Sequence, residues 1–253
     1  MKTAVISGGN GGLGRAMAQA LQASGWHTVL LDRDIDGLKA TPQQTPIKVD
    51  LTDSAALKAA CDHVLAAHPT LDLVIYNAGV SQVAAFSDTA DDSHRRVFEI
   101  NYFAAVAMAR ALLPAVRAAG GRHLAISSVA GFAPLYHRTA YAASKHALQG
   151  FFGSLAAEEV AHGVKTAIAV PSFIGTNLGR DERSTDGIQR PGSASDGVDY
   201  MTPDDAARII LRGVARGRRV IPVGRVAWAS WLISRLSPAL FNRLMRGRIK
   251  GQS

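Results

Sequence analysis

The sequence predicts an α/β protein with one doubly wound parallel sheet in a single domain, followed by a basic and aromatic helical tail. Three observations indicate this fold. Short strand-like runs alternate with helical stretches over residues 1–223. A glycine-rich turn separates the first such run from the first helical stretch. Residues 206–253 carry eleven Arg or Lys and no Asp or Glu, so the basic character belongs to the end of the chain.

Each element follows from a local pattern of apolar residues and breakers. Strands are predicted at residues 3–7, 27–32, 46–49, 71–76, 122–127, 164–170 and 220–223. Helices are predicted at residues 13–24, 53–67, 89–118 (one helix or two) and 140–161. A further helix should begin after Thr202, because a capping threonine, Pro203 and two aspartates in the first turn are typical of a helix start.

Composition limits the class of protein. The chain has 253 residues, 47% of them hydrophobic, which is enough for a full core. Cys61 is the single cysteine, so no intrachain disulfide and no metal site are expected. No signal-peptide core precedes the glycine turn, and no uncharged apolar run reaches the roughly 18 residues that span a bilayer. We therefore expect a cytoplasmic protein.

The charge distribution argues against a nucleic acid partner. Residues 1–205 carry seventeen basic and twenty acidic residues, a net charge of −3. A nucleic-acid enzyme more often spreads basic residues along its cleft, and the basic tail contains no recognisable reader motif. We therefore expect a small-molecule substrate and no nucleic acid.

Two parts are expected in the chain. Residues 1–224 should form a dinucleotide-binding and catalytic domain, and residues 225–253 an amphipathic basic extension. Within the first part, residues 177–200 are rich in Gly, Ser, Asp and Arg and show no apolar period. Loops of this length are often functional lids, so a flexible substrate lid is predicted there.

A Rossmann-like nucleotide site is predicted where the first strand turns into the first helix, at Ser7-Gly8-Gly9-Asn10-Gly11-Gly12-Leu13-Gly14. Glycines permit a tight turn and close approach of a pyrophosphate, whose charge faces the helix N-terminus. Asp32 stands eighteen residues after Gly14, where an acid binds the adenosine ribose hydroxyls and repels a 2′-phosphate, which favours NAD. Arg33 follows directly and could pair with a 2′-phosphate, so NADP stays open.

A second chemical pattern is the pair Tyr141 and Lys145 in Tyr-Ala-Ala-Ser-Lys, with Ser128 thirteen residues before the tyrosine. Positions i and i+4 share one face of a helix, so the ammonium can reach toward the phenol. A free tyrosine has a pKa of roughly 10, and a nearby cation lowers it. The pattern therefore predicts acid-base catalysis, with an ordinary helix and a solvated lysine as the alternative.

Together these motifs resemble the short-chain dehydrogenase/reductase superfamily in its single-domain form, over about residues 1–223. The glycine turn agrees at Gly8, Gly12 and Gly14, with Ser7 in place of the family's threonine. Further matches are Asp50 and Leu51 in the adenine segment, the turn Asn77, Ala78 and Gly79, the helix residue Asn101, and Pro171, Ile174 and Thr176 beside the nicotinamide. Tyr76 stands where asparagine is common, and Ser172 departs from the family's glycine.

The resemblance implies hydride transfer between a nicotinamide cofactor and a secondary alcohol or ketone. Tyr141 would exchange the hydroxyl proton, and Lys145 would lower the Tyr141 pKa and bind the nicotinamide ribose. Ser128 would orient the reacting oxygen, and Asn101 would support a proton relay through water. Cofactor contacts are implied for Gly8, Asn10, Gly12, Leu13, Gly14, Asp32, Arg33, Asp50, Leu51, Asn77, Ala78, Gly79, Tyr141, Lys145, Pro171, Ile174 and Thr176.

The resemblance also implies a homo-oligomer, a tetramer or dimer assembled through the helices near residues 89–118 and 140–161. One rival function comes from another class. A dinucleotide-binding sensor or scaffold without turnover would share the nucleotide site, but it would have no need of an activated tyrosine.

The substrate side is less readable. The segment between Ser128 and Tyr141 contains Phe132, Pro134, Leu135, Tyr136 and His137, which either face the substrate or only pack the loop. Together with the apolar tail, this segment suggests a hydrophobic alcohol or ketone.

The tail combines apolar and basic residues. One stretch without charge contains Trp228, Trp231, Leu232 and Ile233. A second short helix is predicted to begin at Ser237 and Pro238. Its apolar stripe consists of Leu240, Phe241, Leu244 and Met245. Three interpretations stay open: an ordinary terminal element, a lid or subunit contact, and peripheral contact of residues 225–253 with a membrane.

Overall fold

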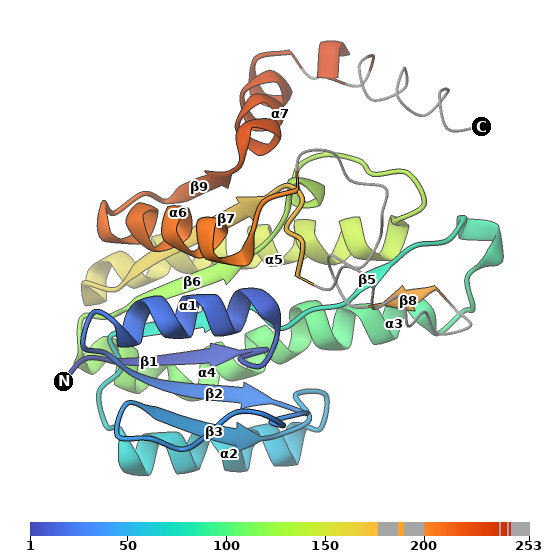
Figure 1. The fold of residues 1–253 in the computed structure, drawn as a ribbon. Coiled ribbons are helices and arrows are strands. Elements are labelled where there is room, and N and C mark those ends of the chain that lie inside the picture. Colours follow the sequence, from blue (N-terminus) through green and yellow to red (C-terminus); the bar gives the residue numbers. More distant parts are fainter. Residues whose placement is uncertain (177–186, 190–199, 238, 242, 244–253) are drawn as a thin grey trace.

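The computed structural model describes residues 1–176, 187–189, 200–237, 239–241 and 243. Within these residues, seven parallel strands form one sheet with the order β3-β2-β1-β4-β6-β7-β9 (Figure 1). The strands are β1 Thr3–Ser7, β2 His27–Asp32, β3 Gln44–Lys48, β4 Leu73–Tyr76, β6 Arg122–Ile126, β7 Lys165–Pro171 and β9 Val220–Val223. This order confirms the predicted doubly wound parallel sheet.

Helices connect and cover these strands. The α-helices are α1 Gly12–Gln22, α2 Ser54–Ala67, α3 Ser93–Phe98, α4 Ala104–Ala118, α5 Thr139–Glu158, α6 Pro203–Ala215 and α7 Arg225–Leu236. A π-helical turn η2, Glu99–Phe103, joins α3 to α4, and three short 3₁₀ turns are η1 Phe86–Asp88, η3 Val129–Gly131 and η4 Glu159–His162. Two further strands, β5 Ser81–Gln82 and β8 Ile188–Gln189, pair antiparallel to each other.

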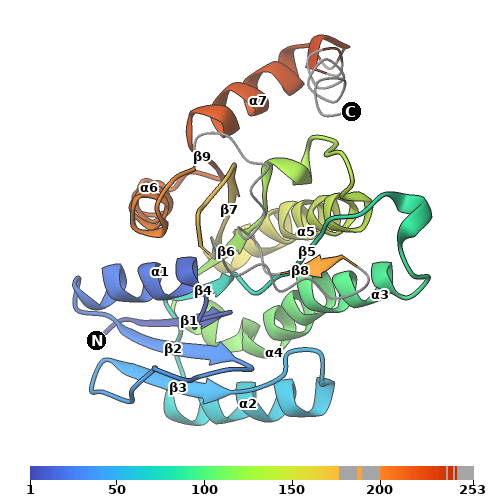
Figure 2. The same cartoon turned by 45° about the vertical axis from the view of Figure 1, so that its right-hand side comes forward.

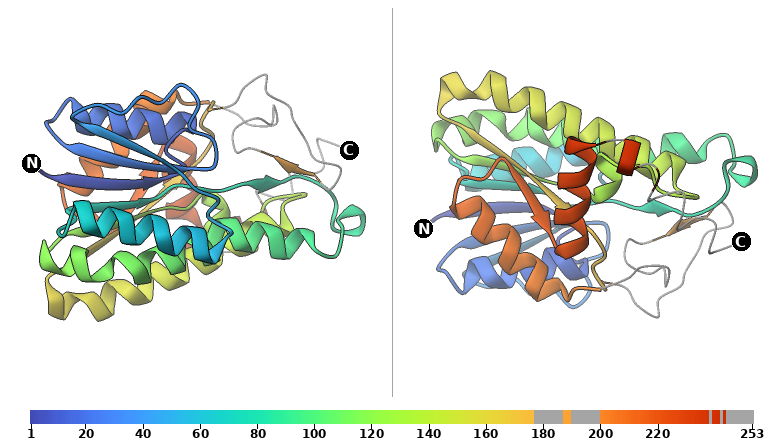
Figure 3. Two further views of the ribbon diagram at one scale, coloured as in Figure 1. Left: turned by 90° about the horizontal axis from the view of Figure 1, so that it is seen from below. Right: turned by 90° about the horizontal axis from the view of Figure 1, so that it is seen from above.

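Two apolar layers enclose the sheet. Met17 of α1 and Ile210 of α6 pack against one face with Ile6 of β1. Met108 of α4 and Phe152 of α5 pack against the other face, which α2 also covers. Figures 2 and 3 show these helix layers on opposite sides of the strands. Burial of each such side chain stabilises the fold by roughly 1.5–3 kcal/mol, so the sheet is a fixed platform for the residues at its edge.

All seven strands of the main sheet end at the same edge, because they are parallel. The carboxyl ends of β1, β2, β4 and β6 bring Ser7, Asp32, Asn77 and Ser128 to that edge. The strand order reverses between β1 and β4, which is where α/β sheets of this kind form a crevice. The sequence motifs therefore converge in space although they are far apart in the chain.

Most element boundaries agree with the sequence patterns, and the differences have local causes. β3 begins two residues earlier than predicted, since its register pairs Gln44 with Thr28 of β2 although Pro46 interrupts the run. The stretch at 89–118 begins at Ser93 and contains a π-turn at its middle. The pair β5 and β8 was not predicted, because two-residue strands carry no periodic signal.

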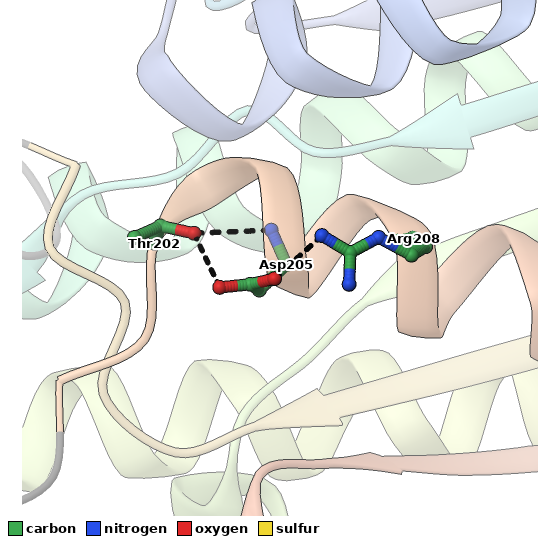
Figure 4. A network of polar contacts seen from close by, with 3 residues as sticks. All are labelled: Thr202, Asp205 and Arg208. Carbon is green, nitrogen blue, oxygen red and sulfur yellow. Dashed lines mark hydrogen bonds and ion pairs between the residues drawn. The ribbon is translucent and has the colours of Figure 1, made fainter.

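The predicted helix start at Thr202 is confirmed by its hydrogen bonds (Figure 4). The Thr202 hydroxyl accepts a bond from the Asp205 amide at 3.1 Å and donates to the Asp205 carboxylate at 2.8 Å. Arg208 donates to the same carboxylate at 2.6 Å. These partners lower the pKa of Asp205, with the Thr202 bond as the largest cause. The network thus satisfies one of the free amides at the helix N-terminus, that of Asp205.

One helix among the described residues, the continuous stretch Ser93–Ala118, has a length and composition that would allow it to cross a membrane, with a mean hydropathy of 1.3. Its inner side carries Met108, Leu112 and Val116 into the apolar layer under the sheet. A core helix of an α/β domain meets the same criteria of length and composition, and the packing of these three residues favours that interpretation.

The tail begins with α7, which packs against β9 and η3. After it, the Ser237 hydroxyl accepts a bond from the Leu240 amide at 3.3 Å, so Ser237 caps a further helical turn as predicted. Phe241 is buried, so this residue of the predicted apolar stripe packs against the protein. Pro238, Leu244 and Met245 lie outside the described residues. The predicted division of the chain at residue 224 stays a prediction.

A buried polar pair lies inside the layer under β4 and β6. The Tyr76 hydroxyl and His123 Nδ1 are 2.7 Å apart, and His123 Nε2 is buried without a hydrogen-bond partner. Burial disfavours the imidazolium and lowers the pKa of His123 to about 4, although the charge of Glu159 acts in the opposite direction. The fold therefore requires a neutral His123.

This requirement predicts a loss of stability in mild acid. The unfolded chain takes up the His123 proton below a pKa of roughly 6.5, whereas the folded chain resists it down to about 4. Stability should fall by roughly 3 kcal/mol as the pH drops between these values, at about 1.4 kcal/mol per pKa unit. His123→Asn, which keeps a partner for Tyr76, should flatten this slope in urea unfolding experiments.

Exposed His63→Asn is the matched control and should retain the wild-type slope. The partly buried His68 has its pKa lowered by burial and by His27, so a residual slope of the same sign should remain in His123→Asn. Equal slopes in wild type and His123→Asn would show that His123 is not the titrating group.

Candidate active site

The glycine turn is shaped by two close approaches. Gly8 has φ +64°, and a side chain there would bring a Cβ within 2.9 Å of the Ala78 backbone. A Cβ on Gly12 would lie 3.1 Å from the Thr176 Cβ. The turn after β1 thus lies between the Asn-Ala-Gly turn and the segment that follows β7. Gly8 needs to be glycine because of its positive φ and its approach to backbone, and Gly12 is tightly packed.

The N-terminus of α1 fits a pyrophosphate. No side chain caps α1, so the first-turn amides of Gly12, Leu13 and Gly14 retain the donor character that an anion needs. Asn10 lies in the same turn and has a buried amide oxygen without a partner. The residues of the glycine turn therefore form a cradle of backbone donors at one end of the helix dipole.

Asp32 is aimed at this cradle. Its carboxylate accepts the Asn10 amide at 2.9 Å and the Asp34 amide at 3.2 Å. The carboxylate therefore joins the end of β2 to the glycine turn. The two carboxylate oxygens have further lone pairs, which can accept hydrogen bonds from the two hydroxyls of a diol.

Arg33 and Asp50 lie at the outer side of the same edge, and both are exposed. Asp50 accepts the Thr52 amide at 2.9 Å and the Thr52 hydroxyl at 2.7 Å, and these bonds lower its pKa with a smaller contribution from the Arg33 charge. Leu51 follows, half-buried, over the layer beneath. The structure thus brings Asp50 near Arg33.

Ser7 ties the first strand to the Asn-Ala-Gly turn. Its hydroxyl accepts the amides of Asn77 at 3.1 Å and Ala78 at 3.2 Å. The Asn77 side chain in turn donates to the Gly8 carbonyl at 2.9 Å. A serine thus supplies the hydroxyl at the position where the family has threonine, and the departure leaves this connection intact.

Asn101 is held by the π-turn in an unusual position. It is buried, and its side chain makes two bonds to the backbone of Val80, from the amide at 2.8 Å and to the carbonyl at 3.0 Å. It also donates to the Ser144 hydroxyl at 2.9 Å. Such π-turns often occur at functional sites, because the extra residue reorients a side chain. Here the turn links Asn101 to the chain after Gly79.

Lys145 is the buried cation of the site, with 4% of its surface exposed. Its ammonium donates to the Ile126 carbonyl at 2.9 Å and lies 5.8 Å from the Tyr141 ring centroid. A Cβ on Gly79 would lie 3.5 Å from Lys145 Nζ and 3.2 Å from Asn101 Oδ1, so Gly79 leaves space between these two groups. Burial lowers the pKa of Lys145 to about 8.

Tyr141 and Ser128 meet beside the lysine. Ser128 caps η3 by accepting the Ala130 amide at 3.1 Å, and it hydrogen-bonds the Tyr141 hydroxyl. The predicted lowering of the Tyr141 pKa by Lys145 is wrong for this structure. Burial is the largest influence and raises the pKa of Tyr141, while the Ser128 bond and the Arg138 charge lower it. The phenol is favoured, since its surroundings are poor in water.

Several supporting residues were missed by sequence reasoning. Ser127 donates to the Lys145 carbonyl at 3.3 Å, and Gln149 donates to Ser127 at 3.0 Å, which fixes the loop that carries Ser128. Ser144 supports Asn101, as described above. Arg138 acts on Tyr141 through its charge. The sequence could have indicated Ser144 and Arg138, because each lies three residues from Tyr141. It could not have indicated Gln149, because the role of that residue depends on tertiary contacts.

The segment after β7 lies against the glycine turn, at the contact between Thr176 and Gly12. Pro171 ends β7 opposite Val223, Ser172 donates to the Val223 carbonyl at 3.3 Å, and Ile174 pairs with Met201. Ser172 is therefore accommodated by a bond to β9. Within the predicted lid, residues 177–186 and 190–199 lie outside the described residues, whereas β8 is paired to β5.

The loop before Tyr141 is tightly folded. His137 has φ +54°, an uncommon conformation for a residue with a side chain, and its ring stacks on Tyr136 at 3.6 Å between centroids. The His137 carbonyl accepts the Ala84 amide at 3.0 Å, which connects this loop to the segment after β5. No contact places His137 on Tyr141 among those described.

Comparison with known proteins agrees with this geometry. The model of the short-chain dehydrogenase family matches residues 2–187. The dehydrogenase/reductase SDR family member 7B of Bos taurus is 34% identical over 97% of this chain and 81% of its own, and the Xenopus laevis protein of that name has the same identity and coverage.

Solved structures share the fold. A short-chain dehydrogenase from Streptomyces avermitilis is 28% identical, covers all of both chains and superposes with a TM-score of 0.83. A short-chain dehydrogenase from Burkholderia cenocepacia in complex with NADP has a TM-score of 0.84 at 21% identity, over 97% of this chain and 99% of its own. A short-chain dehydrogenase/reductase from Burkholderia phymatum in complex with NAD has a TM-score of 0.79 at 22% identity, over 94% of each chain.

The Ser7 connection gives a direct prediction. Ser7→Ala leaves two partly buried amides without their acceptor and should lower the free energy of unfolding by about 1–3 kcal/mol in urea denaturation. Ser7→Thr is the matched control, because it keeps the hydroxyl that accepts both amides. The free energy of unfolding of Ser7→Thr should stay within about 0.5 kcal/mol of the wild-type value. Equal stability of all three proteins would contradict this account.

Proposed function

Because the chain belongs to the short-chain dehydrogenase family, we propose that it is an NAD(P)-dependent oxidoreductase that interconverts a secondary alcohol and a ketone. The observation that carries the proposal is the meeting of Ser128, Tyr141 and Lys145 at the carboxyl edge of the sheet, next to Gly79 and the glycine turn. Ser128 caps η3 and the other two residues lie on α5, whereas Gly79 and the glycine turn come from distant parts of the chain, so their convergence is a property of the fold.

The proposed chemistry divides between a bound cofactor and the side chains. The nicotinamide would accept or give the hydride. Tyr141 gives or takes the hydroxyl proton, and Ser128 holds the reacting oxygen beside the phenol through the hydroxyl that already faces Tyr141. The raised pKa keeps the phenol of Tyr141 protonated near neutral pH, which is the form that the acid of carbonyl reduction needs, although it also makes the phenol a weaker acid.

Lys145 and Asn101 support this step. The ammonium offers two further donors beyond its bond to Ile126, which suit the hydroxyls of a ribose. Asn101 fixes the backbone of Val80 and keeps Gly79 at the distance that leaves space beside Lys145. The proposed proton path leads from Tyr141 past Lys145 toward Asn101 by way of water.

Asp32 favours NAD over NADP in this proposal. Its carboxylate lies beside the glycine turn, where it would bind ribose hydroxyls and repel a phosphate. Arg33 is exposed next to it and keeps NADP as the second choice. Two structural neighbours hold NADP and NAD respectively, which supports a nicotinamide dinucleotide without choosing between them. Tighter binding of NADPH than NADH in calorimetry would overturn the preference.

We propose a hydrophobic alcohol or ketone as the substrate. The loop before Tyr141 contributes Phe132, Leu135 and Tyr136, and α7 lies against η3 on the same side. A panel of aliphatic, aromatic and polyol substrates, followed at the absorbance of reduced nicotinamide, tests this proposal. Faster turnover of polyols would contradict it.

Assembly through α4 and α5 is proposed from the family resemblance. Gly150 and Gly153 on α5 face open space, and Phe103 of η2 is half-exposed, so a second helix could approach this side closely. Sedimentation velocity tests the proposal, and a monomer at working concentration would contradict it.

The catalytic proposal predicts a specific defect for Tyr141→Phe. Removing the phenol oxygen takes away the proton donor, so turnover should fall by roughly 10²–10⁴-fold. NADH affinity should change little, because the glycine turn and Asp32 are untouched. Steady-state kinetics and NADH fluorescence titration measure the two effects.

Tyr102→Phe is the matched control, since the Tyr102 ring packs against Phe103 and Phe151 and belongs to neither the catalytic set nor the proposed substrate side. It should retain wild-type turnover. Wild-type activity in Tyr141→Phe would remove the assignment. A wild-type protein that binds NADH but turns over no alcohol or ketone would instead support the rival function, a dinucleotide-binding sensor or scaffold.

A further inference from the structure

The outer side of α7 carries an apolar stripe, formed by Trp228, Leu232 and Leu236. These residues recur every fourth position and so lie along one side of the helix. Trp228 is 57% exposed and Leu236 is 76% exposed, whereas Ala227 on the opposite side is fully buried against the body. In Figures 1 and 2, α7 extends from the carboxyl end of β9 away from the sheet. The stripe therefore faces outward on a projecting helix.

Basic residues flank this stripe. Arg225 and Arg235 are exposed on the same side of α7, and Arg243 is exposed beyond it. Leu240, in the turn that Ser237 caps, is also half-exposed, so the apolar character continues past α7. The sequence holds no Asp or Glu after Asp205. The surface made by α7 and the following turn is thus apolar and cationic.

We propose that this surface binds a lipid membrane that carries anionic headgroups. Tryptophan and leucine side chains enter the boundary between headgroups and acyl chains, while arginines bind phosphate at the same level. An anionic leaflet attracts each basic side chain near its surface. The spacing of Trp228, Leu232 and Leu236 with Arg225 and Arg235 beside them matches a helix that lies in the plane of such an interface.

Charge argues against a second copy of the chain as the occupant. A two-fold symmetric contact through this surface would place Arg225, Arg235 and Arg243 opposite the same arginines of the other copy. Like charges brought together in this way disfavour association, and the tail supplies no acid to offset them. An anionic lipid surface supplies the missing negative charge over the whole length of the helix.

The position of α7 gives the proposal a geometric consequence. α7 packs against η3, and η3 begins at Ser128. A membrane bound to the outer side of α7 would therefore lie next to the part of the molecule that carries the carboxyl edge of the sheet. This binding is independent of the proposed hydride transfer, since none of the residues in the surface belongs to the catalytic set.

Co-sedimentation of the full chain with vesicles tests the proposal. Phosphatidylcholine vesicles with and without phosphatidylglycerol are compared at low and high salt. Two variants remove the two components: Trp228→Ser with Leu236→Ser, and Arg225→Gln with Arg235→Gln and Arg243→Gln. The matched control joins Val160→Ser and Lys165→Gln, two exposed residues at the opposite edge of the sheet. Circular dichroism and NADH binding establish that each variant is folded.

The full chain and the control should bind vesicles with phosphatidylglycerol, and high salt should weaken the binding. The arginine variant should lose partitioning on the order of 100-fold, and the serine variant should lose it as well. Three results would overturn the proposal: no vesicle binding by the full chain, binding by either variant equal to that of the full chain, or equal binding of the full chain to vesicles without phosphatidylglycerol. Dissociation of an oligomer by the serine variant, without vesicle binding by wild type, would show a subunit contact instead.

Discussion

The candidate site depends on one physical constraint, the burial of the Lys145 ammonium group. A buried cation is costly unless oxygen atoms surround it, and the lowering of its pKa to about 8 corresponds to roughly 3 kcal/mol. The Ile126 carbonyl at the end of β6 supplies one partner. The order of the sheet sets the position of that carbonyl, so the fold and the charge are coupled. α5 then carries Tyr141 to the same place, one helical turn before the lysine.

The neighbouring groups fit around this cation. Asn101 reaches the site only because a π-turn interrupts the helix between α3 and α4. Hydrogen bonds to Val80 and Ser144 hold its side chain, so Asn101 borders the space beside Lys145 and does not fill it. Tyr141 lies in surroundings that favour the phenol. The site thus combines a buried cation with a lowered pKa and a protonated phenol, and the phenol can donate its proton to a carbonyl oxygen.

The motifs predicted the fold and named residues that the structure brings together at the carboxyl edge of the sheet, because glycine turns, strand ends and the four-residue spacing of Tyr141 and Lys145 are local features. The catalytic roles of these residues stay predictions. The sign of the Tyr141 pKa shift could not be predicted, since it depends on how strongly the surrounding chain excludes water. The roles of Gln149 and Ser127 could not be predicted either, because they depend on tertiary hydrogen bonds. β8 and the burial of Phe241 depend on tertiary contacts that no periodic pattern records.

The central proposal is that hydride transfer at this site requires the positive charge of the buried Lys145. The pH dependence of hydride transfer in single turnovers of wild type and Lys145→Met tests it most directly. If the charge is required, carbonyl reduction by wild type slows as the pH rises through about 8, where Lys145 loses its proton. Lys145→Met is then slower by roughly 10²–10⁴-fold and lacks this pH dependence. An unchanged rate and an unchanged pH profile in Lys145→Met would contradict the claim.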